Sequence, residues 1–118
     1  MNVEQLRAYG LAKKATSESL PFDDTSLVLK VMDKMFAILS LDEGAFMNLK
    51  CDPERSLELR AQYPEKITPG YHMNKEHWNS VYFKTEVPEE LVLELIDHSY
   101  DLTVAGMTKK KQAELKEM

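Results

Sequence analysis

Three apolar runs follow Pro21, and the spacing between them predicts three consecutive β-strands. The runs span residues 26–32, 35–41 and 45–51, and short polar connections separate them. Both connections have the length of a hairpin loop, and the second, residues 42–44, contains a glycine. We therefore expect a three-stranded antiparallel meander.

The third apolar run alternates in a way that assigns each side chain to a face. Every second residue is small or apolar, ending at Cys51, and the residues between them are Phe46, Asn48 and Lys50. Because successive side chains of a strand point to opposite faces, the first set is expected to face the core. Lys50 should therefore point to solvent, and Cys51 should point inward.

Helical periodicity marks residues 3–15, 53–63 and 88–104. Asp52-Pro53 is a good start for the second segment, since an aspartate oxygen caps free backbone N–H groups and proline tolerates the first helical position. The third helix would be roughly 25 Å long at about 1.5 Å per residue. His98 and Ser99 lie near its apolar side, where buried polar atoms need partners, so we expect them in a network joining helix to sheet.

The rest of the chain is less regular. Residues 78–84 alternate well enough to form another strand, whereas residues 65–77 are expected to be irregular or weakly extended. The lysine-rich end, residues 108–118, predicts a frayed helix. A chain of 118 residues can bury a sufficient core without staples, so we expect one domain over residues 1–118.

Composition excludes several protein classes. The chain is 43% hydrophobic and 30% charged, and it lacks an apolar run of about 18 residues, so we expect no transmembrane helix. The first residues lack the apolar centre of a secretory signal. Cys51 is the single cysteine, which rules out an internal disulfide and a zinc site of several thiolates and agrees with a reducing compartment. We expect a cytoplasmic protein.

The net charge of −5 is unevenly distributed along the chain. Residues 85–106 hold six acidic groups and no basic one, whereas residues 50–84 hold six basic and five acidic groups. Affinity for nucleic acid comes mainly from basic side chains that displace counterions from phosphate. The overall charge therefore argues against wholesale coating of nucleic acid, but one mildly basic face could still attract an anion.

Four stretches of the sequence resemble the MmcQ/YjbR family: LVLKVMDKMFAILSL, NLKCDPERSLELRAQYP, GYHMNKEHWNSV and LIDHSYDLTVAGMTKKK. The resemblance implies a bacterial α+β protein with a two-layer fold like that of CyaY and frataxin, in which helices pack on one face of an antiparallel sheet of about five strands. Members are described as predicted DNA-binding proteins with a double-wing arrangement, by fold analogy. The resemblance supplies no catalytic residue. At residues 32–34 this chain has Met-Asp-Lys, where many relatives place a glycine pair before the lysine.

A nucleic-acid surface can be assembled from aromatic and basic residues of the middle and end of the chain. Aromatic rings stack on bases, and polar or basic side chains beside them hold the backbone. The candidates are Lys50, Arg55, Tyr71, His72, Asn74, Lys75, Trp78, Lys109, Lys110 and Lys111. The competing interpretation is that Trp78 anchors its loop to the sheet and that the lysines are an ordinary solvated surface.

Other reactive groups have weaker support. Cys51 precedes a helix start, where a thiolate can be stabilised, but its predicted inward orientation favours a packing role. His72 and His77 have a spacing compatible with metal binding, with Glu76 as a third ligand, yet such histidines more often line a surface. The frataxin likeness would also allow iron on the acidic residues between 86 and 101, which more simply form the wet face of a helix.

These observations predict a non-enzymatic domain without a cofactor or a metal site, a monomer that binds DNA through an exposed sheet face and the loop from Tyr71 to Trp78. The alternative is a protein-interaction module that uses the same surface. A third hypothesis is an iron carrier.

Overall fold

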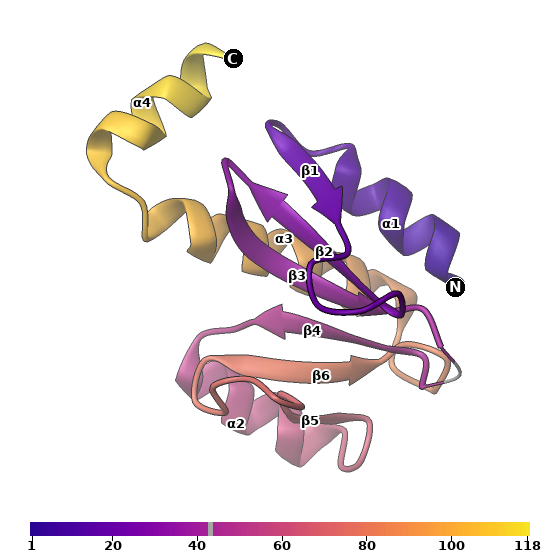
Figure 1. Ribbon diagram of the computed structural model, residues 1–118. Helices are drawn as coiled ribbons and strands as arrows, with labels where there is room; N and C mark the ends of the chain where they lie inside the picture. The colour runs from indigo at the N-terminus through magenta and orange to yellow at the C-terminus, as the bar shows by residue number, and fades with distance from the viewer. Residues whose placement is uncertain (43) are drawn as a thin grey trace.

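The computed structural model describes residues 1–42 and 44–118 as one antiparallel sheet with helices on one face (Figure 1). The six strands lie in the order β1-β2-β3-β4-β6-β5. Helices α1, α2 and α3 lie behind the sheet in Figure 1, and α4 extends to one side. The elements are α1 (Val3–Leu11), β1 (Thr16–Ser19), β2 (Ser26–Val31), β3 (Lys34–Ser40), β4 (Phe46–Lys50), α2 (Pro53–Gln62), β5 (Ile67–Pro69), β6 (Trp78–Tyr82), α3 (Glu89–Ala105) and α4 (Lys109–Glu117).

The predicted α+β fold, the meander β2-β3-β4 and helices α2 and α3 are confirmed, and the sheet has six strands rather than about five. The predicted first helix ends at Leu11 instead of Ala15, because the Thr16 hydroxyl donates to the carbonyls of Leu11 and Lys13 and Ala15 turns into the left-handed region with φ 60°. The chain then forms the edge strand β1, which the sequence analysis did not predict.

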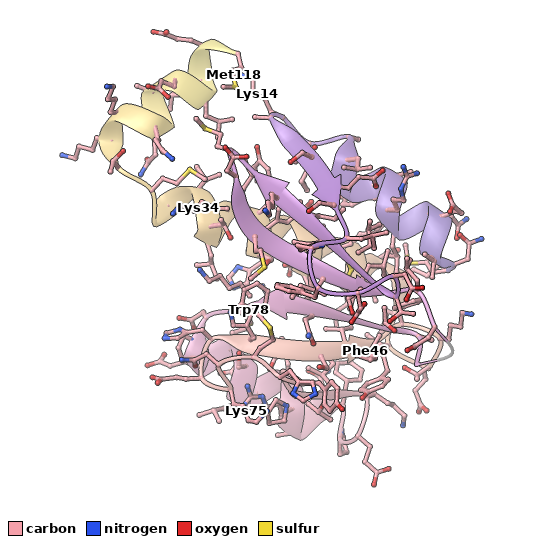
Figure 2. The ribbon with its side chains drawn as sticks, viewed as in Figure 1. Lys14, Lys34, Phe46, Lys75, Trp78 and Met118 are labelled. Atoms are coloured by element: carbon pink, nitrogen blue, oxygen red, sulfur yellow. The ribbon has the colours of Figure 1, made fainter. Side chains whose placement is uncertain are left out.

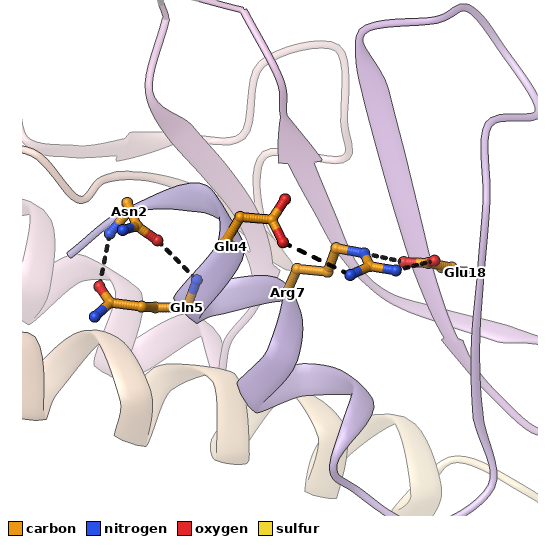
Figure 3. Close-up of polar contacts among 5 residues, drawn as sticks. All are labelled: Asn2, Glu4, Gln5, Arg7 and Glu18. Carbon is orange, nitrogen blue, oxygen red and sulfur yellow. Dashed lines mark hydrogen bonds and ion pairs between the residues drawn. The ribbon is translucent and has the colours of Figure 1, made fainter.

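Helix α1 is fixed at its start and along its length. The Asn2 side chain accepts a hydrogen bond from the Gln5 N–H, and the Gln5 side chain accepts one from the Asn2 N–H, which is a capping box (Figure 3). Arg7 pairs with Glu18 on β1 (Figure 3). Gly10 permits close packing, since a Cβ atom there would lie 2.6 Å from Leu29 Cδ1.

Ser99 joins α3 to the two central strands. Its hydroxyl donates to the Phe36 carbonyl on β3 and accepts from the Lys50 N–H on β4 at 2.8 Å. His98 Nε2 accepts from the Asp52 N–H at 3.2 Å. The polar network expected for His98 and Ser99 is therefore present: Ser99 connects α3 to the sheet, and His98 connects α3 to the start of α2.

The β2–β3 hairpin turns through two residues, Met32 and Asp33, with φ of 46° and 67°. Positive φ at both loop positions is the signature of a type I′ turn, in which glycine is favoured. Glycine adopts this geometry without steric cost, and this chain adopts it with two side chains present.

Candidate binding groove on the open sheet face

The strand register fixes which side chains share the face that α1, α2 and α3 leave uncovered, because directly paired residues point to the same side. Three rows cross this open face. The first row is Ser26, Ser40, Phe46 and Tyr82, and the second is Val28, Ile38, Asn48 and Ser80. The register between β2 and β3 shifts after Leu29, so the third row consists of two separate pairs, Lys30 with Met35 and Lys50 with Trp78. The first and third rows are four residues apart along a strand, roughly 13 Å at about 3.3 Å per residue.

A closed polar network holds the loop after β5 against this face. The Ser80 hydroxyl donates to Asn48 Oδ1, the Asn48 amide donates to the Tyr71 carbonyl at 3.1 Å, and the Tyr71 N–H donates to the Ser80 hydroxyl at 3.0 Å. Asn48 and Ser80 are buried, so these bonds satisfy groups that would otherwise be costly. The loop therefore forms a fixed wall above β4 and β6.

A groove of about 520 Å³ opens between this wall and the segment before β2. Its floor includes Ile38, and its sides include Phe22 and Tyr71, whose side chains are 67% and 58% exposed. Tyr71 meets the Phe46 ring edge to face, with ring centroids 6.1 Å apart. Large exposed aromatics around an apolar floor are typical of a binding site rather than of a plain surface.

Two carboxylates line the end of the groove at the first row. Asp42 accepts from the Ser40 hydroxyl at 2.7 Å and from the Gly44 N–H at 2.8 Å, and these bonds hold the pKa of Asp42 below its ordinary value of 3.8. The Thr25 N–H donates to Asp23 at 2.9 Å and likewise lowers the pKa of Asp23. Both groups are therefore anionic near neutral pH, as hydrogen bonds to the charged form dictate.

The structure separates the expected aromatic platform. The Tyr71 and His72 rings both line the groove, with their centroids 4.0 Å apart and their planes tilted by 56°, and His72 has φ 58°. Trp78 lies in the third row and is 7% exposed, with the Lys50 ammonium 6.0 Å from its ring centroid. Figure 2 shows Phe46 and Trp78 toward opposite ends of the β4–β6 pair. The indole thus packs beneath the loop, which leaves Tyr71 and His72 as the exposed rings.

The expected basic residues are also dispersed. Lys75 donates to the Gly70 carbonyl at 2.9 Å inside its own loop, and exposed Asn74 accepts from the Glu76 N–H at 3.0 Å. Arg55 forms a bidentate pair with Glu94 of α3, on the helical side. Lys109, Lys110 and Lys111 start α4, after the Thr108 cap. Of the expected cations, Lys50 is the one that the register places on the open face. Lys30 of β2, which the sequence reasoning did not single out, lies on the same face with β3 between the two lysines.

Four of the six acidic residues between positions 86 and 101 form ion pairs: Glu86, Glu89, Glu94 and Asp97. Asp97 accepts from the Tyr9 hydroxyl at 2.8 Å and pairs with Lys13, whose ammonium lies 5.2 Å from the Tyr9 ring centroid. Glu89 lies 3.1 Å from the N-terminal amine, and Glu86 lies 2.8 Å from Lys66. Among residues 1–42 and 44–118, no three His, Cys, Asp or Glu side chains converge on a position that could hold a metal ion.

Cys51 faces the core and is 3% exposed. Burial raises the pKa of its thiol, and the nearby Ser56 hydrogen bond opposes this only in part. A thiol that stays protonated is a poor nucleophile. Its packing role is therefore supported over a reactive one.

Within the described part of the chain, no helix is long and apolar enough to cross a bilayer.

Comparisons with known proteins agree with this architecture. The YjbR family profile matches residues 11–102. The chain belongs to the YjbR family. It is 30% identical to the uncharacterized protein YjbR of Escherichia coli K12 over 113 residues, which cover 95% of each chain, and 45% identical to YbdF of Escherichia coli O157:H7 over 78% of this chain and 75% of that one.

Two solved structures have folds similar to that of this YjbR-family chain. The crystal structure of the Deinococcus radiodurans protein DR2400 has a TM-score of 0.91 and 40% identity, and covers 98% of this chain and 88% of that one. A Pseudomonas syringae protein has a TM-score of 0.74 and 30% identity, and covers 87% of this chain and 99% of that one. These relatives share family and fold, and their descriptions assign no activity.

Sequence reasoning missed part of the groove. Phe22, Asp23 and Asp42 lie in connections, where polar residues are ordinarily assigned to solvent. The available signal was a phenylalanine beside two aspartates in the connection before the meander, Phe22-Asp23-Asp24. An apolar ring in an otherwise polar loop is a cue for an exposed contact.

Proposed function

We propose that this YjbR-family protein is a non-enzymatic binding domain that holds a segment of another protein in the groove on its open sheet face. This is the protein-interaction module considered from the sequence. The family membership sets the fold, and the groove supports the proposed activity. The domain would act as a monomer that presents this face.

The single observation that supports this function best is the exposed apolar lining of the groove. Phe22 and Tyr71 flank Ile38 in the groove and are exposed, whereas aromatic side chains in a core are buried. Covering them with apolar groups of a partner would remove that surface from water, at about 25 cal/mol per Å². A groove of about 520 Å³ has the size of a site that takes a few side chains.

Affinity measurements on matched variants test this function. The probe is a fluorescent library of short acetylated peptide amides that are rich in apolar side chains. Tyr71→Ala should weaken the best peptides about tenfold, since a buried aromatic anchor contributes at least 1.4 kcal/mol. The fold should persist because the network uses only the Tyr71 backbone.

The control for that experiment is Leu57→Ala, because Leu57 is 66% exposed on α2, outside the groove. It removes a similarly exposed apolar side chain and should leave affinity unchanged. Equal losses in both variants, or no binding by any peptide in the library, would contradict the proposed function.

DNA binding is the second candidate, supported by Lys30 and Lys50 on the open face and by the fold analogy drawn for the family. A salt titration of duplex and single-stranded DNA binding tests it, because phosphate contacts make affinity fall with salt. If DNA binds here, Lys30→Glu should abolish the salt-dependent affinity and Lys110→Glu on α4 should have a smaller effect. No affinity at low salt would end this candidate.

The buried thiol of Cys51 supports the cytoplasm as the proposed location, because an unpaired cysteine suits a reducing compartment.

A further inference from the structure

The groove carries two carboxylates, Asp23 and Asp42, that form no ion pair with a described residue, in contrast to three acidic residues that join neighbouring elements. Glu18, Glu94 and Asp97 each pair with an arginine or a lysine. Among the ion pairs of residues 1–42 and 44–118, none involves Asp23 or Asp42. The anionic end of the groove therefore has no cation of its own among the described residues.

The two carboxylates are held in place by the chain around them. Both hydrogen bonds that the described residues give Asp42 end on Oδ1, which leaves Oδ2 as an acceptor for another group. Asp23 is held by the Thr25 N–H and the Ser26 hydroxyl. Asp23 and Asp42 both line the groove, and the charge of Asp23 opposes the lowering of the Asp42 pKa by the Ser40 and Gly44 hydrogen bonds, so the two carboxylates repel each other. A cation placed beside both would relieve that repulsion.

The apolar part of the groove adjoins this anionic end. Phe46 shares the first row with Ser40, which donates to Asp42, and Ile38 occupies the next row. Phe22 is adjacent in sequence to Asp23. The lysines of the open face, Lys30 and Lys50, lie in the third row at the opposite end. An occupant thus meets apolar surface beside negative charge.

We propose that the groove selects a protein segment in which an arginine or lysine side chain lies next to apolar side chains, with the cation between Asp23 and Asp42. This inference rests on the proposed function and adds the charge and position of the recognised group. Arginine suits the pair better than lysine, because its planar guanidinium offers several donors that can reach two carboxylates at once. The apolar neighbours of the arginine cover Ile38 and Phe46.

Matched peptides test this inference directly. Acetylated peptide amides of identical apolar composition carry arginine, norleucine or glutamate at one position, and their dissociation constants are measured by fluorescence anisotropy. The arginine peptide should bind about tenfold more tightly than the norleucine peptide, and the glutamate peptide should bind most weakly, since one charge-assisted contact corresponds to about a factor of ten. Raising the salt concentration should reduce the arginine advantage.

Two isosteric variants locate the effect. Asp42→Asn keeps an oxygen for the Ser40 and Gly44 bonds and should remove most of the arginine preference while leaving norleucine-peptide affinity unchanged. Asp101→Asn is the control, because Asp101 is exposed on α3 and makes the same change in net charge away from the groove. It should preserve the preference.

The outcomes separate this inference from the proposed function. Equal binding of the three peptides, or an unchanged preference in Asp42→Asn, would overturn the cation site while the apolar groove stands. A preference lost equally in Asp101→Asn would also overturn it, because a general field would then account for the effect. Failure of all three peptides to bind would overturn both proposals.

Discussion

At the scale of single residues, the β2–β3 hairpin contains a strained backbone conformation at Asp33, which the side-chain pattern does not reveal. Asp33 is exposed and has φ 67°, in the left-handed region that costs non-glycine residues roughly 1 kcal/mol or more. The sequence predicted the hairpin with its connection at residues 33 and 34, and the structure turns one residue earlier, at Met32 and Asp33. It did not show the strain, because the strain belongs to the turn type and becomes visible only when φ is known.

The free energy of unfolding should depend on how well the residue at position 33 tolerates a positive φ. Asp33→Gly should raise the free energy of unfolding by about 0.5 kcal/mol, and Asp33→Ala should lower it, since alanine has a Cβ and lacks the local hydrogen bonding of aspartate. Urea titration of both variants beside the parent protein provides the measurement. An alanine variant as stable as the glycine variant would show that the turn is not of this type.

The buried thiol of Cys51 should be chemically quiet in the folded protein. Burial raises its pKa and leaves its side chain 3% exposed, so an aromatic disulfide reagent should react slowly in buffer and rapidly in concentrated urea. The rate of colour release measures the reaction of the thiol in buffer and in concentrated urea. A fast reaction in buffer would contradict the packing role.

At the scale of elements, Ser99 shows how one polar residue connects a helix to two strands. Its hydroxyl satisfies the Phe36 carbonyl and the Lys50 N–H where β3 and β4 adjoin. The helical pattern predicted that Ser99 would be buried and in need of partners. The identity of those partners could not be predicted, because it depends on which strands α3 crosses.

Ser99→Ala should lower the free energy of unfolding by about 2 kcal/mol, because both backbone groups lose their partner in a buried place. Ser17→Ala on the exposed part of β1 is the control and should change stability by less than about 0.5 kcal/mol. Urea unfolding of the two variants gives the comparison. Equal stability of both would mean that the bridging bonds contribute nothing.

At the scale of the whole molecule, the sequence predicted the layers of the fold but only part of the groove. The central strands β2 and β3 are buried on both faces and therefore stand out as apolar runs, whereas α3 is long and amphipathic. The edge strands β1 and β5 are short and polar or proline-containing, so local patterns carry little signal for them. The groove joins loops from both halves of the chain, which no local pattern can relate.

Acidification should destabilise the folded protein through these loops. The pKa values of Asp23 and Asp42 are lowered by hydrogen bonds in the folded state, so their contribution is present above the ordinary aspartate value and is lost as the pH falls through the lowered values. The free energy of unfolding should decrease as the pH falls below the ordinary aspartate pKa of about 4, and it should decrease less in the double variant with asparagine at both positions. An identical acid dependence would contradict these shifts.

The most direct test of the central claim, that the open sheet face is the binding surface, is an amide shift map of the isotopically labelled protein with an arginine-containing apolar peptide. The shifts should concentrate on residues that line the groove, from the segment at Phe22 through Ile38 and Phe46 to Tyr71, and α2 should stay unchanged. Shifts that concentrate on α2 and α3, with the groove unchanged, would contradict the account.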